Sequence, residues 1–160
     1  MYDQLDANGQ VVRANFQLGM YDKLPEGHRW VEHVSSPEDA KKLMWTAIKA
    51  ERERLSSDGG YSVAVDGVPK WFHSDPKSKT QQLALVMFGA SVPPVLWKTM
   101  DKSKVPMTQA LAGQIFQAAS LQDMALFAAG EAHYDALQLS LDPANYDYSG
   151  GWPAVYVATP

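Results

Sequence analysis

The chain has 160 residues, of which 14 are lysine or arginine and 18 are aspartate or glutamate, so its formal net charge is −4, and it contains no cysteine. With 46% hydrophobic and 20% charged residues, it has the composition of a globular protein rather than a disordered one. The mild acidity argues against a nucleic-acid binder, and the missing cysteine excludes disulfides, thiolate zinc sites and a thiol nucleophile.

The first part of the chain predicts short β-strands. Asn8-Gly9 is expected to supply the positive φ angles of a tight hairpin turn that leads into a strand over 11–16. A second short strand is predicted over 28–32. Since such small β units are marginal by themselves in water, we expect residues 1–35 to form a small β-rich N-terminal unit.

A helix is predicted over 37–56. Ser36 can cap it, and Pro37 suits its first position. Apolar residues at helical spacing predict one buried stripe, formed by Ala40, Leu43, Met44, Ala47 and Ile48. Two arginines are expected in the last turns, where cations are favourable, and two glycines then end the helix: Arg52, Arg54, Gly59 and Gly60.

Two hairpins are predicted after this helix. The first covers 61–73, with Tyr61, Val63 and Val65 on one face and the turn at Asp66-Gly67. The second covers 95–107, with its turn at 101–104. Pro106 would confine the return strand of the second hairpin to the edge of a sheet.

Two further helices are predicted. Asp75-Pro76 is a start signal for a helix over 76–91, and residues 83–88 of it are apolar on every side. We therefore expect this helix to be the buried central element. Thr108 is expected to cap a long helix that runs to about 139. Its predicted buried stripe is rich in small residues and consists of Leu111, Ile115, Ala118, Ala125, Ala129 and Ala132.

Groups that suggest chemistry have simpler structural explanations. His73 and Asp75 resemble half of a general-acid or metal pair, but a strand-end histidine followed by a helix-capping aspartate explains them better. Neither Glu131 with His133 nor His28 with His33 gathers the three or four ligands that a metal needs. We therefore predict no catalytic, cofactor-binding or metal-binding residues.

A lysine-rich hairpin turn is the weak nucleic-acid candidate in this chain. Lys98, Lys102 and Lys104 lie close to Trp97 along the second predicted hairpin. Lysines are common on edge strands, where they discourage aggregation, and the whole chain is acidic. A charged hairpin turn is therefore the favoured interpretation, and we expect neither nucleic acid nor membrane as a partner.

The C-terminal tail, 141–160, carries aromatic residues among glycine and proline, with little periodicity. Exposed aromatics are favoured anchors of protein interfaces. The alternative is a tail folded back onto its own core, and the sequence leaves both open. The candidate partner-binding residues are Tyr146, Tyr148, Trp152 and Pro153 of the tail, together with Trp30.

Residues 36–140 resemble a domain of unknown function found in bacteriophage and prophage tail proteins. The likeness is carried by Ile48 to Arg54, Gly59-Gly60, Val65-Asp66-Gly67, Trp71 to Asp75, Trp97 to Asp101 and Val105 to Thr108. Two flanking segments are similar to segments of tail-fibre assembly proteins: Leu24 to Glu32, and Tyr146-Asp147 with Gly151-Trp152-Pro153. The second hairpin departs from the expected Asp-Gly turn, because Asp101 is followed by Lys102.

Together these features predict the fold class, the domain organisation and the function. The fold class is α+β: three helices packed with two short hairpins, plus the β-rich N-terminal unit. The chain divides into 1–35, a core of 36–140 and a tail of 141–160. The resemblance implies a non-enzymatic phage tail component, associated with the fibre or baseplate. It would be located in the virion tail, or in the host cytoplasm during assembly.

Two other functions stay open at this point, as does assembly into a homo-oligomer. One is a tail fibre assembly chaperone, for which a small, acidic, globular chain is equally suitable. The other is a carbohydrate-binding or receptor-binding module, with Trp71, Trp97 or Trp152 as stacking platforms. The resemblance carries no catalytic residues that could be transferred to this chain.

Overall fold

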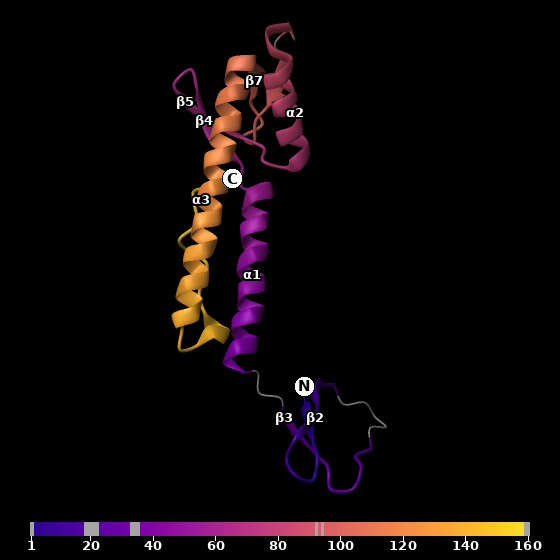
Figure 1. Ribbon diagram of the computed structural model, residues 1–160. Helices are drawn as coiled ribbons and strands as arrows, with labels where there is room; N and C mark the ends of the chain where they lie inside the picture. Colours follow the sequence, from indigo (N-terminus) through magenta and orange to yellow (C-terminus); the bar gives the residue numbers. More distant parts are fainter. Residues whose placement is uncertain (1, 18–22, 33–35, 92, 94, 159–160) are drawn as a thin grey trace. The chain divides into compact units, whose positions relative to one another are not determined.

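The computed structural model describes residues 2–17, 23–32, 36–91, 93 and 95–158. They divide into two compact units, Met1–Ala40 and Lys41–Pro160, and each is described by itself (Figure 1). The first unit thus ends five residues later than the predicted boundary at 35. The second unit includes the tail together with the helices and hairpins.

The N-terminal unit contains a three-stranded antiparallel sheet. Its strands are β1 (Tyr2–Leu5), β2 (Val11–Phe16) and β3 (Arg29–Glu32), in the order β2-β1-β3. The turn between β1 and β2 is held by Asp6, whose Oδ1 accepts 2.8 Å hydrogen bonds from two following backbone N–H groups, those of Asn8 and Gln10. Of the predicted pair Asn8-Gly9, only the glycine has a positive φ, at 82°. The side chain of Asp6 therefore stabilises the turn that we expected Asn8 and Gly9 to make by themselves.

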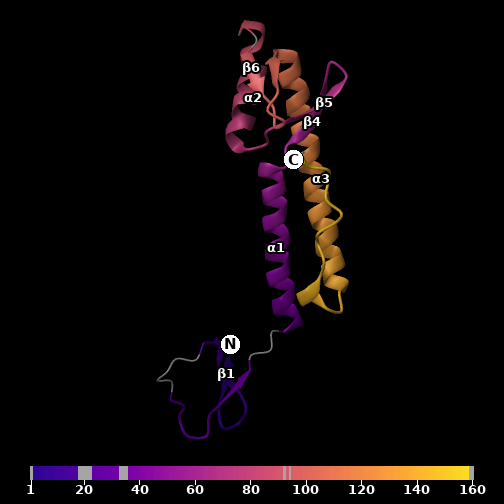
Figure 2. The ribbon, with the colours of Figure 1, turned by 180° about the vertical axis from the view of Figure 1, so that it is seen from behind.

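The C-terminal unit follows the predicted order of helix, hairpin, helix, hairpin and long helix. Its elements are α1 (Pro37–Asp58, which begins in the first unit), β4 (Tyr61–Val65), β5 (Val68–Phe72), α2 (Pro76–Phe88), η1 (Gly89–Ser91), β6 (Val95–Lys98), β7 (Lys104–Met107), α3 (Gln109–Leu139) and η2 (Pro143–Asn145). Figures 1 and 2 show α2 alongside the first half of α3 and α1 alongside its second half. The predicted α+β fold class is confirmed.

One hydrophobic core joins both hairpins to the first half of α3. The hairpins contribute Tyr61 and Phe72 from β4-β5 and Val105 and Met107 from β6-β7. The helix contributes Leu111, Ala112, Ile115 and Ala119. Phe72 and Ile115 have no exposed surface. Because each hairpin has only two strands, it is the helix that lets them bury one face.

The expectation that α2 is the buried central element is wrong. Gln82 is the residue of α2 that is buried, whereas Met87 is 78% exposed and Phe88 is 67% exposed. A helix that is apolar on every side needs partners on every side to be buried. Here the two hairpins and α3 already form the core, so α2 covers one side of it and leaves its other side in solvent.

The predicted apolar stripes are only partly buried. In α1, Ala40 and Ile48 are buried, but Leu43 is 69% exposed. In the second half of α3 the predicted Ala125 and Ala132 are exposed, and the buried residues there are Leu126, Gly130 and Leu137. The helix changes partners along its length, from α2 and the hairpins to α1, and the buried face shifts accordingly. The α1 helix also extends to Asp58, so its last turn contains neither predicted arginine.

Candidate functional site

His133 of α3 holds the C-terminal tail. Its Nδ1 is 3.0 Å from the Tyr146 hydroxyl, and its Nε2 is 2.9 Å from the Gly150 carbonyl oxygen, to which it donates. The ring centroids of His133 and Trp152 are 4.9 Å apart, and the Trp152 indole N–H donates to the carbonyl of Tyr148 at 2.8 Å. The first half of the tail therefore packs around the imidazole ring of His133.

The second half of the tail is attached by hydrogen bonds to its backbone atoms. The Tyr156 N–H donates to the carbonyl of Gly59, directly after α1, at 2.8 Å. The side-chain amide of Gln122 donates to the carbonyl of Ala154 at 2.9 Å. The Tyr156 ring also lies 6.2 Å from that of Trp71, centroid to centroid.

The tail therefore folds back onto its own core, which is one of the two interpretations that the sequence left open. Tyr146, Tyr148, Trp152 and Pro153 are half-buried residues of this internal packing. The structure brings these four predicted residues together. Trp30 belongs to the N-terminal unit, where it lines a pocket.

Replacing His133 by alanine is expected to expose the tail to proteolysis. The substitution removes both hydrogen bonds and the contact with Trp152, at a cost of about 1–2 kcal/mol. Chymotrypsin cleavage after the tail aromatics, followed by mass spectrometry, measures this exposure. Asp135→Ala, at an exposed position of the same helix, is the control; an equal cleavage rate in both variants would contradict the assigned role of His133.

A polar cluster joins the two hairpins. Lys70 of β5 donates to Asp101 Oδ2 at 2.8 Å and to the Ser103 hydroxyl at 2.9 Å. Asp101 also accepts hydrogen bonds from the Thr99 hydroxyl and from the Ser103 N–H. The hydrogen bonds from Lys70, Thr99 and Ser103 hold the pKa of Asp101 well below its usual range.

This polar cluster stabilises the turn between β6 and β7, which contains no glycine. Lys102 has a φ of 67°, a conformation that glycine adopts more readily than lysine. Asp101 accepts hydrogen bonds from Thr99, which precedes Lys102, and from Ser103, which follows it. These bonds stabilise the turn although it contains no glycine. The Lys70 ammonium forms an ion pair with the Asp101 carboxylate at 2.8 Å, which ties β5 to this turn.

The other candidate groups have structural roles. Asp75 caps α2, accepting from the Ser78 N–H at 3.0 Å and from the Ser78 hydroxyl at 2.6 Å, and these bonds lower its pKa. Glu131 lies 3.9 Å from Arg52, while His133 binds the tail. His33 lies outside the described residues. Within the described ranges, no group of three or more histidine or acidic side chains is placed to hold a metal.

The lysines of the second hairpin follow the charged-turn interpretation. Lys98 and Lys104 are opposite each other where β6 pairs with β7, and Lys102 lies in the turn between these strands. All three are exposed, whereas Trp97 packs against the core. The indole is therefore directed to the interior rather than placed beside the lysines as a stacking platform.

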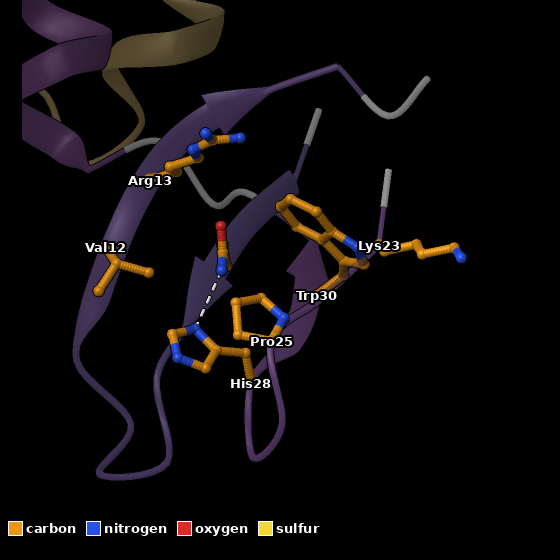
Figure 3. A pocket seen from close by; sticks show the side chains of 7 residues that line it. Val12, Arg13, Lys23, Pro25, His28 and Trp30 are labelled. Carbon is orange, nitrogen blue, oxygen red and sulfur yellow. Dashed lines mark hydrogen bonds between the residues drawn. The ribbon is translucent and has the colours of Figure 1, made fainter. Parts of the chain in front are cut away.

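A pocket of about 320 Å³ lies in the N-terminal unit. It is lined by Gln4, Val12, Arg13, Lys23, Pro25, His28 and Trp30 (Figure 3). Gln4 Nε2 is 2.9 Å from His28 Nδ1. Among these residues, Trp30 is the one that the sequence indicated as a partner-binding candidate; Gln4, Val12 and Arg13 come from paired strands, and Lys23, Pro25 and His28 come from the segment before β3.

Comparison with known proteins gives one family. Residues 39–150 match a family described as a domain of unknown function, DUF4376. The match spans more than half of the chain, so the chain belongs to this family. No curated protein and no solved structure matches it. Of the helices in the described part of the chain, none has the length and apolarity needed to cross a membrane.

Proposed function

We propose that this member of the DUF4376 family is a non-enzymatic component of a bacteriophage tail, associated with the fibre or the baseplate and acting through protein–protein contacts. The phage context comes from the resemblance of residues 36–140 and of both flanks to phage tail and tail-fibre assembly proteins. It is the motif order of the whole chain that supports it, rather than any one residue.

Exposed apolar side chains on α3 are the observation that carries the contact role. Leu121 is 59% exposed, Met124 is 68% exposed and Phe127 is 57% exposed, all within seven residues of one helix. Apolar patches of this kind on a surface mark interaction sites. Because the tail aromatics pack on their own chain, the exposed apolar surface proposed for partner contact lies on α3 instead. We call these three residues the α3 patch.

Much of the charge of α3 is balanced within the chain. Of its three acidic residues, Asp123 lies 2.9 Å from the Lys79 ammonium and Glu131 lies 3.9 Å from the Arg52 guanidinium. Arg52 also lies over the Phe127 ring, 5.4 Å from its centroid. The apolar side chains are therefore the main feature of the α3 patch, and an apolar segment of a tail protein is the complement that it favours.

Mass spectrometry of purified virions tests the proposed location. The chain is expected in mature particles at a fixed ratio to a tail protein. A chain found in infected cells but missing from mature virions would exclude a tail component. In that case a fibre protein that misfolds without the chain would indicate an assembly chaperone instead.

Changing the α3 patch is expected to remove the chain from the particle. The double variant Leu121→Glu and Met124→Glu introduces two charges into the patch, which a desolvated interface does not tolerate. Incorporation into virions should fall at least about tenfold, as expected when an apolar contact is lost. Gln117→Glu, on the same helix and also exposed, controls for added charge. Unchanged incorporation of the double variant would place the contact elsewhere.

A further inference from the structure

Strand β6 has a backbone edge that points away from its partner β7. Pro106 of β7 lies opposite Leu96 of β6 and has no N–H, so these two residues cannot exchange backbone hydrogen bonds. The Thr99 N–H, one residue after Lys98, donates to the Ser103 carbonyl at 2.9 Å. Because bonded and non-bonded pairs alternate along antiparallel strands, the N–H and C=O groups of Leu96 and Lys98 both point outward.

These outward groups are open to an added strand. In the part of the chain that the structure describes, no backbone or side-chain group forms a hydrogen bond with them. Leu96 is 71% exposed, and Lys98 is exposed as well. An unpaired strand edge is a template for another extended segment, which completes the backbone hydrogen bonds by joining the sheet. The edge of β6 therefore fits an extended peptide rather than a helix.

Two rows of side chains cross the outer face of the β6-β7 hairpin. Trp97 packs against the core, so its neighbours Leu96 and Lys98 lie on the opposite face of the hairpin. Strand pairing places Leu96 beside Pro106 and Lys98 beside Lys104, and all four residues are exposed. One row is therefore apolar and the next is cationic.

The cationic row has no counter-charge. Like charges directly opposite each other on neighbouring strands destabilise the pairing. Among the residues placed by the structure, none forms an ion pair with Lys98 or Lys104, and the acidic residue of this hairpin, Asp101, is paired with Lys70. Lys102 adds a further exposed cation in the turn. A carboxylate beside Lys98 would relieve the repulsion between the two opposed lysines.

We propose that the free edge of β6 binds an extended acidic segment of a partner protein, which adds a strand to the hairpin. An apolar side chain of this segment continues the row of Leu96, and an acidic side chain two positions away continues the row of Lys98. The backbone of the segment pairs with the outward N–H and C=O groups. This role of β6 is independent of the proposed phage function and of the α3 patch.

Charge favours such a segment over two other occupants. If two copies of the chain paired through β6, Lys98 and Lys104 of both copies would share one face of the joined sheet and repel each other. A nucleic acid would be attracted by the lysines, but it would leave the backbone groups of the edge and the apolar row unused. An acidic strand satisfies the backbone, the apolar row and the charge together.

NMR titration of the full chain with short peptides tests the proposal. The peptide Thr-Val-Thr-Glu-Thr, called the glutamate peptide, has an apolar and an acidic residue two positions apart. It is expected to shift the amide signals of Leu96 and Lys98, and to bind about fivefold more tightly than Thr-Val-Thr-Lys-Thr, which reverses the charge. Methylating the backbone nitrogens of its valine and glutamate removes the donors that face β6 and should abolish the shifts.

Three variants of the chain separate the contributions. Lys98→Gln should weaken binding of the glutamate peptide about threefold, as expected for an exposed ion pair. Lys102→Gln removes the same charge from the turn and should retain wild-type affinity at physiological salt, which screens charges that are not adjacent. Leu96→Pro removes an outward N–H that β7 does not use, and should weaken binding about fivefold. Unchanged amide signals of α3 in this variant confirm that it is folded.

Four results would overturn the inference. Absence of shifts at Leu96 and Lys98 would mean that the edge binds no acidic strand. Equal weakening in Lys98→Gln and Lys102→Gln would show that only the net charge of the hairpin attracts the peptide. Undiminished binding of the methylated peptide would exclude strand addition. Dimers that Leu96→Pro disrupts, or an oligothymidylate that binds as tightly as the glutamate peptide, would identify a second copy or a nucleic acid as the occupant.

Discussion

Replacing Gly60 by alanine is expected to lower the free energy of unfolding by about 3 kcal/mol. Gly60 has a φ of 67°, where a side chain costs roughly 1–2 kcal/mol. An added Cβ would also lie 2.9 Å from the Phe72 carbonyl oxygen and in direct contact with the Met100 sulfur. The first of these neighbours is backbone in the core, so it cannot move away cheaply.

Gly67→Ala is the matched control for this prediction. Gly67 has a φ of 79°, but nothing lies within 4 Å of an added Cβ there. Gly67→Ala should therefore lower the free energy of unfolding only by the conformational cost of a side chain at positive φ, about 1–2 kcal/mol. Urea denaturation of both variants, followed by circular dichroism, measures the difference. Equal losses would mean that crowding around Gly60 is unimportant.

Raising the pH from 10 to 12 is expected to lower the free energy of unfolding by about 2 kcal/mol through Tyr61 alone. Burial raises the pKa of Tyr61 from 10.0 to about 12, against a hydrogen bond to Gln82 that lowers it. Tyr61 is 3% exposed, and its hydroxyl donates to Gln82 Oε1 at 2.5 Å. The folded state thus resists loss of the phenol proton, whereas the unfolded chain loses it near pH 10.

The sign follows from the raised pKa in the folded state. The contribution of Tyr61 is complete below pH 10 and is lost as the pH rises towards 12. Tyr61→Phe removes the titrating group and leaves Gln82 Oε1 without that donor, so it should be less stable at pH 8 by about 1 kcal/mol. Its stability should then fall less steeply above pH 10 than that of the wild type. Parallel pH curves for the two proteins would contradict the assignment.

Local sequence signals determined the elements of this protein and their order. The turn at Asp66-Gly67 and the caps Asp75 and Thr108 predicted where a hairpin turns and two helices begin, because these residues act on backbone atoms within a few positions. Hydrophobic periodicity predicted α1 and α3, whereas α2 was predicted from its start signal at Asp75-Pro76. The α+β class was therefore predictable, as was the assignment of His73 and Asp75 to a strand end and a helix cap.

The tertiary structure determined which residues are buried and which residues come together in the candidate sites. Whether α2 or α3 occupies the centre depends on how much apolar surface all the elements offer together, which no single segment encodes. The fold of the tail depends on His133, which is 13 residues before Tyr146. The N-terminal pocket depends on Gln4 meeting Arg13 and Trp30 through strand pairing. Contacts between distant residues leave no local pattern, so the sequence could nominate Trp30 as a candidate but could not place Gln4 and Arg13 in the same row of the sheet.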